Sequence, residues 1–296
     1  MTRRAWLLFV ALSLIWGVPY LLIRVAVQSV DPLIVAAGRT AIGALVLLPL
    51  AWRRGVLGPA FRRWRPLLLF TLVEISIPWV LLGHAETRLT SSTAGLMIAA
   101  VPLTAALLLT LLGDERIDGR RLAGLALGFG GVAALVGLDL EASDLGAVSA
   151  LAVAVLGYAI GPIVIARRLS DVPPLGVVTA SLLLATALYA PFAPRAWPSV
   201  VPGTAAAAIV TLALLCTALA FLLFFALVAE AGPARATVIT YVNPAIAVLL
   251  GVLVLDEPLT LGMAIGFPLV VVGSVLGTAR TRDDSAAPAR SPEAAA

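Results

Sequence analysis

The chain alternates long apolar runs with short breaks that carry arginine, proline or acidic residues. About 20 consecutive apolar residues are enough for a helix to cross the hydrocarbon core of a bilayer. Ten runs approach this length, and they cover residues 5–27, 32–51, 66–83, 89–112, 121–138, 145–166, 174–192, 204–228, 233–254 and 259–279. The pattern predicts an all-α integral membrane protein with ten transmembrane helices.

Composition supports this assignment. Hydrophobic residues make up 61% of the chain and charged residues 12%, against roughly 45–50% and about 25% in soluble domains. Too little polar surface remains to cover a water-soluble globule. The polar segment 281–296, rich in alanine, proline and serine, is expected to be a disordered cytoplasmic tail.

The arginines predict the orientation. All 20 basic residues are arginine, and with ten spans 16 of them fall in segments on the N-terminal side, 3 on the other side and 1, Arg39, within a span. Cytoplasmic loops carry such an excess of positive charge. Both termini are therefore expected to be cytoplasmic, in a plasma membrane or a bacterial inner membrane. Because the basic balance sets orientation, it gives no reason to expect nucleic acid as a partner.

Part of the sequence occurs twice without a gap, at an offset of 142 positions. The first copy contains Ala94, Pro102, Asp114 and Glu115, and the second contains Ala236, Pro244, Asp256 and Glu257. Such self-similarity predicts two copies of one structural unit, over 1–140 and 141–280. Each unit holds five spans, an odd number, so the second copy must be inverted in the membrane. Inverted repeats around a midplane site are a common transporter architecture.

These residues, together with Trp16-Gly17 and Arg39, resemble the EamA-type members of the drug/metabolite transporter superfamily. The resemblance extends from about Trp6 to Gly277. It implies ten helices in two inverted five-helix repeats, and export or import of a small amino-acid-like or drug-like amphiphile without ATP. Of the two directions we expect export. The seventh-span counterpart of Arg39 is Ala180 or Ser181, so this chain has no second arginine there.

Glu74 is the strongest candidate for a transport role. It follows Pro66 by eight residues, which places it about 12 Å into the bilayer, and Arg39 lies about 10 Å deep from the opposite side. An ionisable group at such depth indicates function by default. Either the two form a structural ion pair between the second and third spans, or Glu74 carries a coupled proton. The counterpart of Glu74 is Cys216, so the scaffold needs no carboxylate there, which favours transport.

Symmetry-related prolines and nearby polar side chains indicate where a cavity could form. Pro102 and Pro244 are expected to bend the fourth and ninth spans beside a central cavity. Tyr241 and Asn243 precede Pro244. Asn243 could hydrogen-bond a polar group of the substrate or could link two helices.

Aromatic side chains within the spans are expected to line this cavity with an apolar wall that has polar tips. They are Trp16, Tyr20, Trp79 and Tyr158.

The acidic pairs Asp114-Glu115 and Asp256-Glu257 close the fourth and ninth spans at opposite faces. Charges at span ends are usually solvated, which favours a purely structural interpretation. Their mirrored recurrence leaves a capping or gating role as the alternative.

The sequence gives little support for an enzyme. One histidine, His84, and one cysteine, Cys216, exclude a metal site built from several such residues, and no phosphate-binding loop of the Gly-Lys-Ser/Thr type occurs. A membrane hydrolase would need His84 beside a serine such as Ser76 or Ser181, and a channel would show a ring of pore-lining charges. We therefore expect no cofactor or metal. The expected partners are a small-molecule substrate, the lipid bilayer and, through Glu74, protons; a homodimer is left open.

Overall fold

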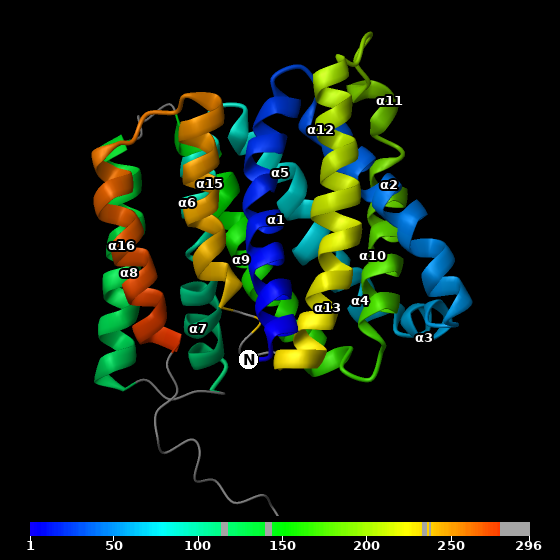
Figure 1. Cartoon of the computed structure of the whole chain (residues 1–296), viewed down its shortest axis with the longest axis horizontal. Coiled ribbons are helices and arrows are strands. Elements are labelled where there is room, and N and C mark those ends of the chain that lie inside the picture. Colours follow the sequence, from blue (N-terminus) through cyan, green and yellow to red (C-terminus); the bar gives the residue numbers. More distant parts are fainter. Residues whose placement is uncertain (114–117, 140–143, 233–235, 237, 279–296) are drawn as a thin grey trace, which may run out of the picture.

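The computed structural model covers the full chain and describes residues 1–113, 118–139, 144–232, 236 and 238–278. In these residues every regular element is a helix, and the helices stand side by side in one bundle (Figure 1). Eight helical runs in this part of the chain are long and apolar enough to cross a membrane, and two shorter apolar helices complete a set of ten. The all-α fold with ten transmembrane helices is confirmed.

The first five spans form the first repeat. The third and fourth of them are built from consecutive segments that follow one another along the same direction. The elements are α1 (Arg3–Val27), α2 (Pro32–Arg53), α4 (Trp64–Phe70), η1 (Thr71–Ser76), α5 (Ile77–Glu86), α6 (Ser91–Ile98), α7 (Val101–Leu111) and α8 (Gly119–Asp139), with a short α3 (Leu57–Arg62) before α4.

The second repeat has the same order of spans in the opposite orientation. Its eighth span is again composite. The elements are α9 (Leu145–Arg168), α10 (Pro174–Tyr189), α12 (Gly203–Ala213), η3 (Leu214–Leu219), α13 (Ala220–Ala231), α15 (Ile239–Leu255) and α16 (Leu261–Thr278), with a short α11 (Ala193–Ala196) before α12.

The last helices of the two repeats, α8 and α16, pack against each other at one edge of the bundle (Figure 1). Glycines let their backbones meet: a Cβ atom on Gly124 would overlap Gly273 and Gly277, and one on Gly131 would overlap Gly266. Gly124 and Gly266 are counterparts at the 142-residue offset, and so are Gly131 and Gly273. Gly124 therefore meets the counterpart of Gly131, and Gly131 meets the counterpart of Gly124, as two inverted copies require. Small residues permit this close packing in membranes.

The two symmetry-related prolines have different effects. The fourth span is divided into α6 and α7 just before Pro102, whereas α15 continues through Pro244. Pro102 lies in the first turn of α7, where its missing N–H is not needed. The fourth span is thus interrupted beside Pro102, while a bend of the ninth span at Pro244 stays a prediction.

Candidate functional site

Two spans contain a π-helical segment at corresponding places. The segment η1 interrupts the third span and η3 interrupts the eighth, and their first residues are 143 positions apart, close to the 142-residue repeat offset. Such segments inside α-helices are frequent at functional sites. After η1, Pro78 has no N–H to donate to the carbonyl of Glu74, which disturbs the α-helical hydrogen bonding there.

Arg39 of α2 lies between these two spans. Its guanidinium carbon is 3.7 Å from the centroid of the Trp79 ring on α5, and its Nε donates a 2.8 Å hydrogen bond to the Thr217 hydroxyl of η3. Thr217 in turn donates to the carbonyl of Leu212, five residues earlier, at 2.9 Å. The arginine is only 8% exposed. The π-helical turn of the eighth span thus orients the hydroxyl that orients Arg39.

Three phenol groups are near enough to Arg39 to interact with its charge. Arg39 interacts electrostatically with Tyr20, Tyr158 and Tyr189, and with the thiol of Cys216. The Tyr189 hydroxyl donates a 2.7 Å hydrogen bond to the carbonyl of Ser76, the last residue of η1. We call Tyr20, Arg39, Trp79, Tyr158, Tyr189, Cys216 and Thr217 the arginine cluster.

Within the described residues no carboxylate forms an ion pair with Arg39, unlike Arg4, which pairs with Glu230, and Arg63, which pairs with Asp171. The structural interpretation of Arg39 and Glu74 as an ion pair is therefore wrong. Glu74 instead faces α9, where a Cβ atom on Gly161 would overlap its carboxyl group. Its Oε2 is buried and has no hydrogen-bond partner among the residues that the structure describes. Glu74 remains close enough to interact electrostatically with Tyr158, a member of the arginine cluster.

Half of the ten predicted substrate-site residues are close to one another. Tyr20, Arg39, Trp79 and Tyr158 belong to the arginine cluster, and Glu74 adjoins it. Trp16 instead packs on Phe221 and Phe224 of the eighth span.

The other candidates lie on the fourth and ninth spans and have partners elsewhere. The Tyr241 hydroxyl is 3.0 Å from that of Thr278. With its amide oriented to satisfy both groups, Asn243 donates to the carbonyls of Ser13 and Ile239 at 3.2 and 3.0 Å, which links α15 to α1. This arrangement matches the interpretation of Asn243 as an inter-helix contact. Pro102 and Pro244 make no described contact with the arginine cluster.

The acidic residues at the end of the ninth span have different environments. Asp256 is exposed and ends α15 in the left-handed conformation at φ 53°. Glu257 is 9% exposed and accepts hydrogen bonds from the backbone N–H groups of Ser91 and Ser92 at 2.7 and 2.9 Å, and from the Ser92 hydroxyl. A carboxylate at a helix N-terminus is favoured by its free N–H groups and by the helix dipole. The capping alternative therefore holds for Glu257, while Asp114 and Glu115 lie outside the described residues.

Glu86 was not among the residues singled out from sequence. The third span extends three residues beyond the predicted end at 83, so Glu86 belongs to it and is 0% exposed. Neither carboxyl oxygen has a hydrogen-bond partner, while Arg24 donates to its backbone carbonyl. Glu86 also interacts electrostatically with Glu257. This end of the bundle, which we call the Glu257 end, thus holds two neighbouring acidic side chains.

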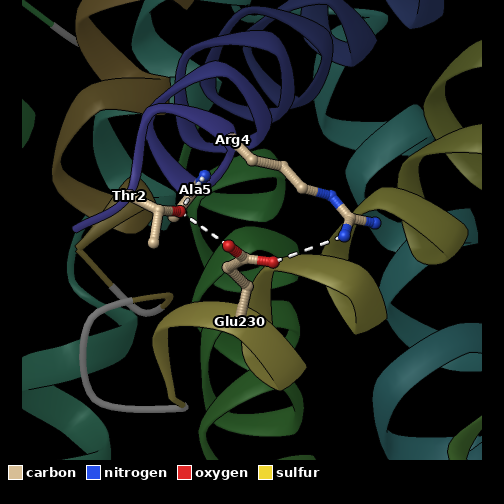
Figure 2. Close-up of polar contacts among 4 residues, drawn as sticks. All are labelled: Thr2, Arg4, Ala5 and Glu230. Carbon is tan, nitrogen blue, oxygen red and sulfur yellow. Dashed lines mark hydrogen bonds and ion pairs between the residues drawn. The ribbon is translucent and has the colours of Figure 1, made fainter.

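At the opposite end, α1 is attached to the end of the eighth span (Figure 2). The Thr2 hydroxyl donates to Glu230 at 2.6 Å and accepts from the N–H of Ala5 at 3.1 Å. Arg4 lies 3.5 Å from the second carboxylate oxygen of Glu230. Helix α1 is therefore connected to different neighbours at its two ends, to Glu86 at one and to Glu230 at the other.

Thr217 and Tyr189 were also missed. Thr217 follows Cys216, the counterpart of Glu74, so the repeat offset pointed to the right turn but not to the right residue. Tyr189 stands near the end of an apolar run, where nothing in the sequence distinguishes it.

The serine–histidine pair of the enzyme hypothesis is not formed. His84 is exposed, whereas Ser76 and Ser181 are buried. No hydrogen bond joins His84 to either serine in the described part of the chain.

The EamA-like transporter family matches this chain twice, over residues 3–137 and 145–278. The "Uncharacterized transporter YvbV" of Bacillus subtilis (strain 168) is 28% identical over 295 residues, covering 97% of this chain and 95% of that protein. The "Uncharacterized inner membrane transporter YedA" of Escherichia coli (strain K12) is 29% identical over 253 residues, covering 81% and 79%. One solved crystal structure has the same fold, with a TM-score of 0.68 at 24% identity and coverage of 94% of this chain and 98% of that one.

Proposed function

We propose that this chain, which belongs to the EamA-like transporter family, is a secondary transporter that moves a small organic metabolite by alternating access. The observation that carries the proposal is Arg39, buried between Trp79 of the third span and Thr217 of the eighth, with no ion pair to a carboxylate of the described residues. Burying a charge is costly unless the charge is paired. A Thr217 hydrogen bond and the Trp79 ring compensate it in part, so an anionic group of the substrate would complete the site.

The surroundings of Arg39 favour an amphiphilic substrate that carries a carboxylate. A guanidinium binds a carboxylate through two parallel hydrogen bonds, and only its Nε is used by Thr217. Trp79 and the tyrosines of the arginine cluster offer apolar faces with polar edges to the remainder of the molecule. Amino-acid-like metabolites have this combination, and we propose them first.

We further propose that Glu74 carries a proton that is coupled to transport. Its carboxyl group is directed toward Gly161, has one oxygen without a partner, and adjoins the arginine cluster through Tyr158. An unpartnered buried carboxyl is costly in its charged form. Hydration of the cavity during the transport cycle would let this group release its proton, and closure would favour protonation.

Alternating access requires that the two repeats separate at one end of the bundle at a time. Glu257 of the second repeat joins Ser91 and Ser92 of the first, so its release would accompany opening of the Glu257 end. From the arginine distribution we propose that this end faces outward and that both termini are cytoplasmic. We separately propose export as the direction of transport.

The cysteine offers a direct test of access. Cys216 is the chain's one cysteine, is buried and belongs to the arginine cluster. In right-side-out vesicles, a membrane-impermeant maleimide should label it slowly in the native protein and faster in Glu257→Gln. Asp256→Asn, which changes the exposed neighbour, is the matched control. Equal labelling rates in Glu257→Gln and the control would contradict a role for Glu257 in closing this end.

Transport itself is tested in proteoliposomes with a panel of amino acids and other small organic acids. We expect saturable uptake of at least one of these without ATP, and exchange with unlabelled substrate inside the vesicles. Flux that never saturates would indicate a channel, and flux that appears only with ATP would exclude a secondary transporter. A chemically altered product in detergent would indicate an enzyme.

A further inference from the structure

Two cavities follow one another along the seam between the third span and α9. The first has a volume of about 300 Å³ and is lined by Arg65, Pro66, Leu69, Ile163, Val164, Arg167 and Arg168. The second has a volume of about 120 Å³ and is lined by Val73, Ile77, Pro78, Val153, Leu156, Gly157 and Ile160. The first is basic and the second is apolar.

The lining residues place the two cavities in line along the same two helices, and we call them together the groove. On the third span, Leu69, Val73 and Ile77 recur every four residues, and on α9 the lining residues from Val153 to Arg168 recur every three or four. Such spacing places residues along one face of a helix. The distance from Arg65 to Ile77 corresponds to about 18 Å of helix, close to the roughly 15 Å of hydrocarbon in one leaflet.

The groove opens toward the surroundings of the bundle. Leu69, Ile77 and Val153 on its walls are 47%, 43% and 48% exposed, and exposed apolar side chains of membrane spans face lipid. At the basic end, Trp64 is 56% exposed, and its ring centroid lies 5.3 Å from the guanidinium carbon of Arg65. Tryptophan is enriched at the level of the headgroups. The arginines therefore lie where a lipid has its phosphate.

The positive charge is specific to this seam. Neither Arg65 nor Arg168 has an ion pair with a described residue. At the repeat offset their counterparts are Ala207 on α12 and Ala26 on α1, so the symmetry-related seam lacks these charges. An excess of arginine at one end of the bundle sets orientation, but it does not require that the arginines line a cavity that continues into an apolar groove.

We propose that this groove binds one anionic phospholipid, with Arg65 and Arg168 contacting the phosphate and an acyl chain lying along the apolar cavity. Basic pockets between transmembrane helices recognise anionic headgroups in this way. A soluble phosphate ester would use the same arginines but would leave the apolar part empty. The site lies outside the arginine cluster, so it is independent of the proposed transport activity and can be measured without a transport substrate.

The test uses native mass spectrometry of the purified full-length protein in detergent, with phosphatidylglycerol or phosphatidylcholine of identical acyl chains. We expect one phosphatidylglycerol to bind at least about tenfold more tightly than phosphatidylcholine. The double variant Arg65→Gln/Arg168→Gln should lose this preference. The matched control Arg53→Gln/Arg54→Gln removes two exposed arginines at the end of α2 that do not line the groove, and it should keep the preference.

A second variant keeps the proposal testable if the double variant folds poorly. Leu156→Trp fills the apolar cavity from a residue that is 43% exposed, and it should weaken phosphatidylglycerol binding while the arginines remain. Equal binding of the two lipids, or equal loss in the control, would overturn the site. Competition by glycerol 3-phosphate as strong as that by phosphatidylglycerol would overturn the lipid assignment in favour of a soluble phosphate.

Discussion

The third and eighth spans share a backbone irregularity but differ in chemistry. Both change from α to π hydrogen bonding for six residues at corresponding points. At the repeat offset the first carries Glu74 and the second Cys216. The π-helical segments therefore belong to the architecture of the repeat, while a carboxyl group is present in one copy only.

The two π-helical segments also differ in the residues that they contact. The residue Thr217 of η3 holds Arg39, whereas Glu74 of η1 turns away toward Gly161. The seventh-span counterpart of Arg39 is Ser181. Duplication thus produced two spans with similar backbones, the third and the eighth. The site is asymmetric because these spans differ in their polar side chains. The eighth span orients the cation, and the third span carries the unpaired acid.

The largest expected effect is from loss of the cation. Arg39→Gln removes the charge that an anionic substrate would neutralise, and hydrogen bonds to charged groups contribute about 1.5–3 kcal/mol, or roughly 10- to 150-fold in affinity. Transport assays and binding calorimetry should show this loss for an anionic substrate. Ser181→Ala, at the counterpart position, should change affinity by less than about twofold.

If Arg39→Gln and Ser181→Ala weakened binding equally, the second span and its seventh-span counterpart would contribute equally. That result would contradict the asymmetry of the site. Arg39→Lys, which keeps the charge but not the two-pronged geometry, should lie between the native protein and Arg39→Gln.

The next largest effect concerns coupling. Glu74→Gln keeps the shape and hydrogen-bonding capacity of the side chain but cannot titrate. With one coupled proton, each pH unit supplies about 1.36 kcal/mol, or about tenfold accumulation. The variant should lose accumulation driven by a pH gradient in proteoliposomes while it retains exchange of labelled for unlabelled substrate. Cys216→Ala should retain both.

If Glu74→Gln still accumulates substrate when only a proton gradient is supplied, Glu74 has a structural role. The difference between Glu74 in η1 and Cys216 in η3 would then affect helix packing and not proton coupling.

Much of the fold could be predicted from the sequence because apolar run length and the repeat offset are direct consequences of membrane thickness and duplication. The directions in which Arg39 and Glu74 point, and hence the lack of an ion pair between them, could not be predicted. Depth along a helix follows from residue counting, but the direction of a side chain around the axis depends on hydrogen bonding, and each π-helical segment changes this direction for the residues near it. Glu74 belongs to such a segment, so the regular-helix count that placed it at the right depth gave no information on which helix it faces.

The site residues that were missed have a related explanation. Thr217 and Tyr189 are important because of single hydrogen bonds, to Arg39 and to the Ser76 carbonyl, and an isolated threonine or tyrosine in an apolar run has no pattern that indicates such a bond. Glu86 lies beyond the apolar run that ends at residue 83, and burial of its carboxyl group depends on how neighbouring helices cover it.

A smaller effect, on stability, is expected when the space occupied by the Glu74 carboxyl group is filled. Gly161→Ala places a methyl group where the Glu74 carboxyl group lies, and overpacking of this kind costs about 1–3 kcal/mol. Thermal unfolding in detergent should show a lower midpoint. Gly146→Ala on the same helix, where a Cβ atom meets nothing within 4 Å, should not lower it. In a Glu74→Ala background the cost of Gly161→Ala should largely disappear, as a double-mutant cycle can measure; an unchanged cost would show that the two residues do not share this space.

The smallest effect should distinguish the two π-helical segments by one hydroxyl group each. Thr217 and Thr71 both donate to a carbonyl of their own helix, at 2.9 and 2.8 Å, but only Thr217 also accepts from Arg39. Thr217→Val removes that acceptor with little change in shape, and one such bond contributes about 1 kcal/mol, or roughly fivefold in the affinity for an anionic substrate. Thr71→Val should affect stability alone. Affinity measured by calorimetry on both variants decides between these outcomes: if Thr71→Val weakens binding as much as Thr217→Val, the eighth span does not orient Arg39 for binding.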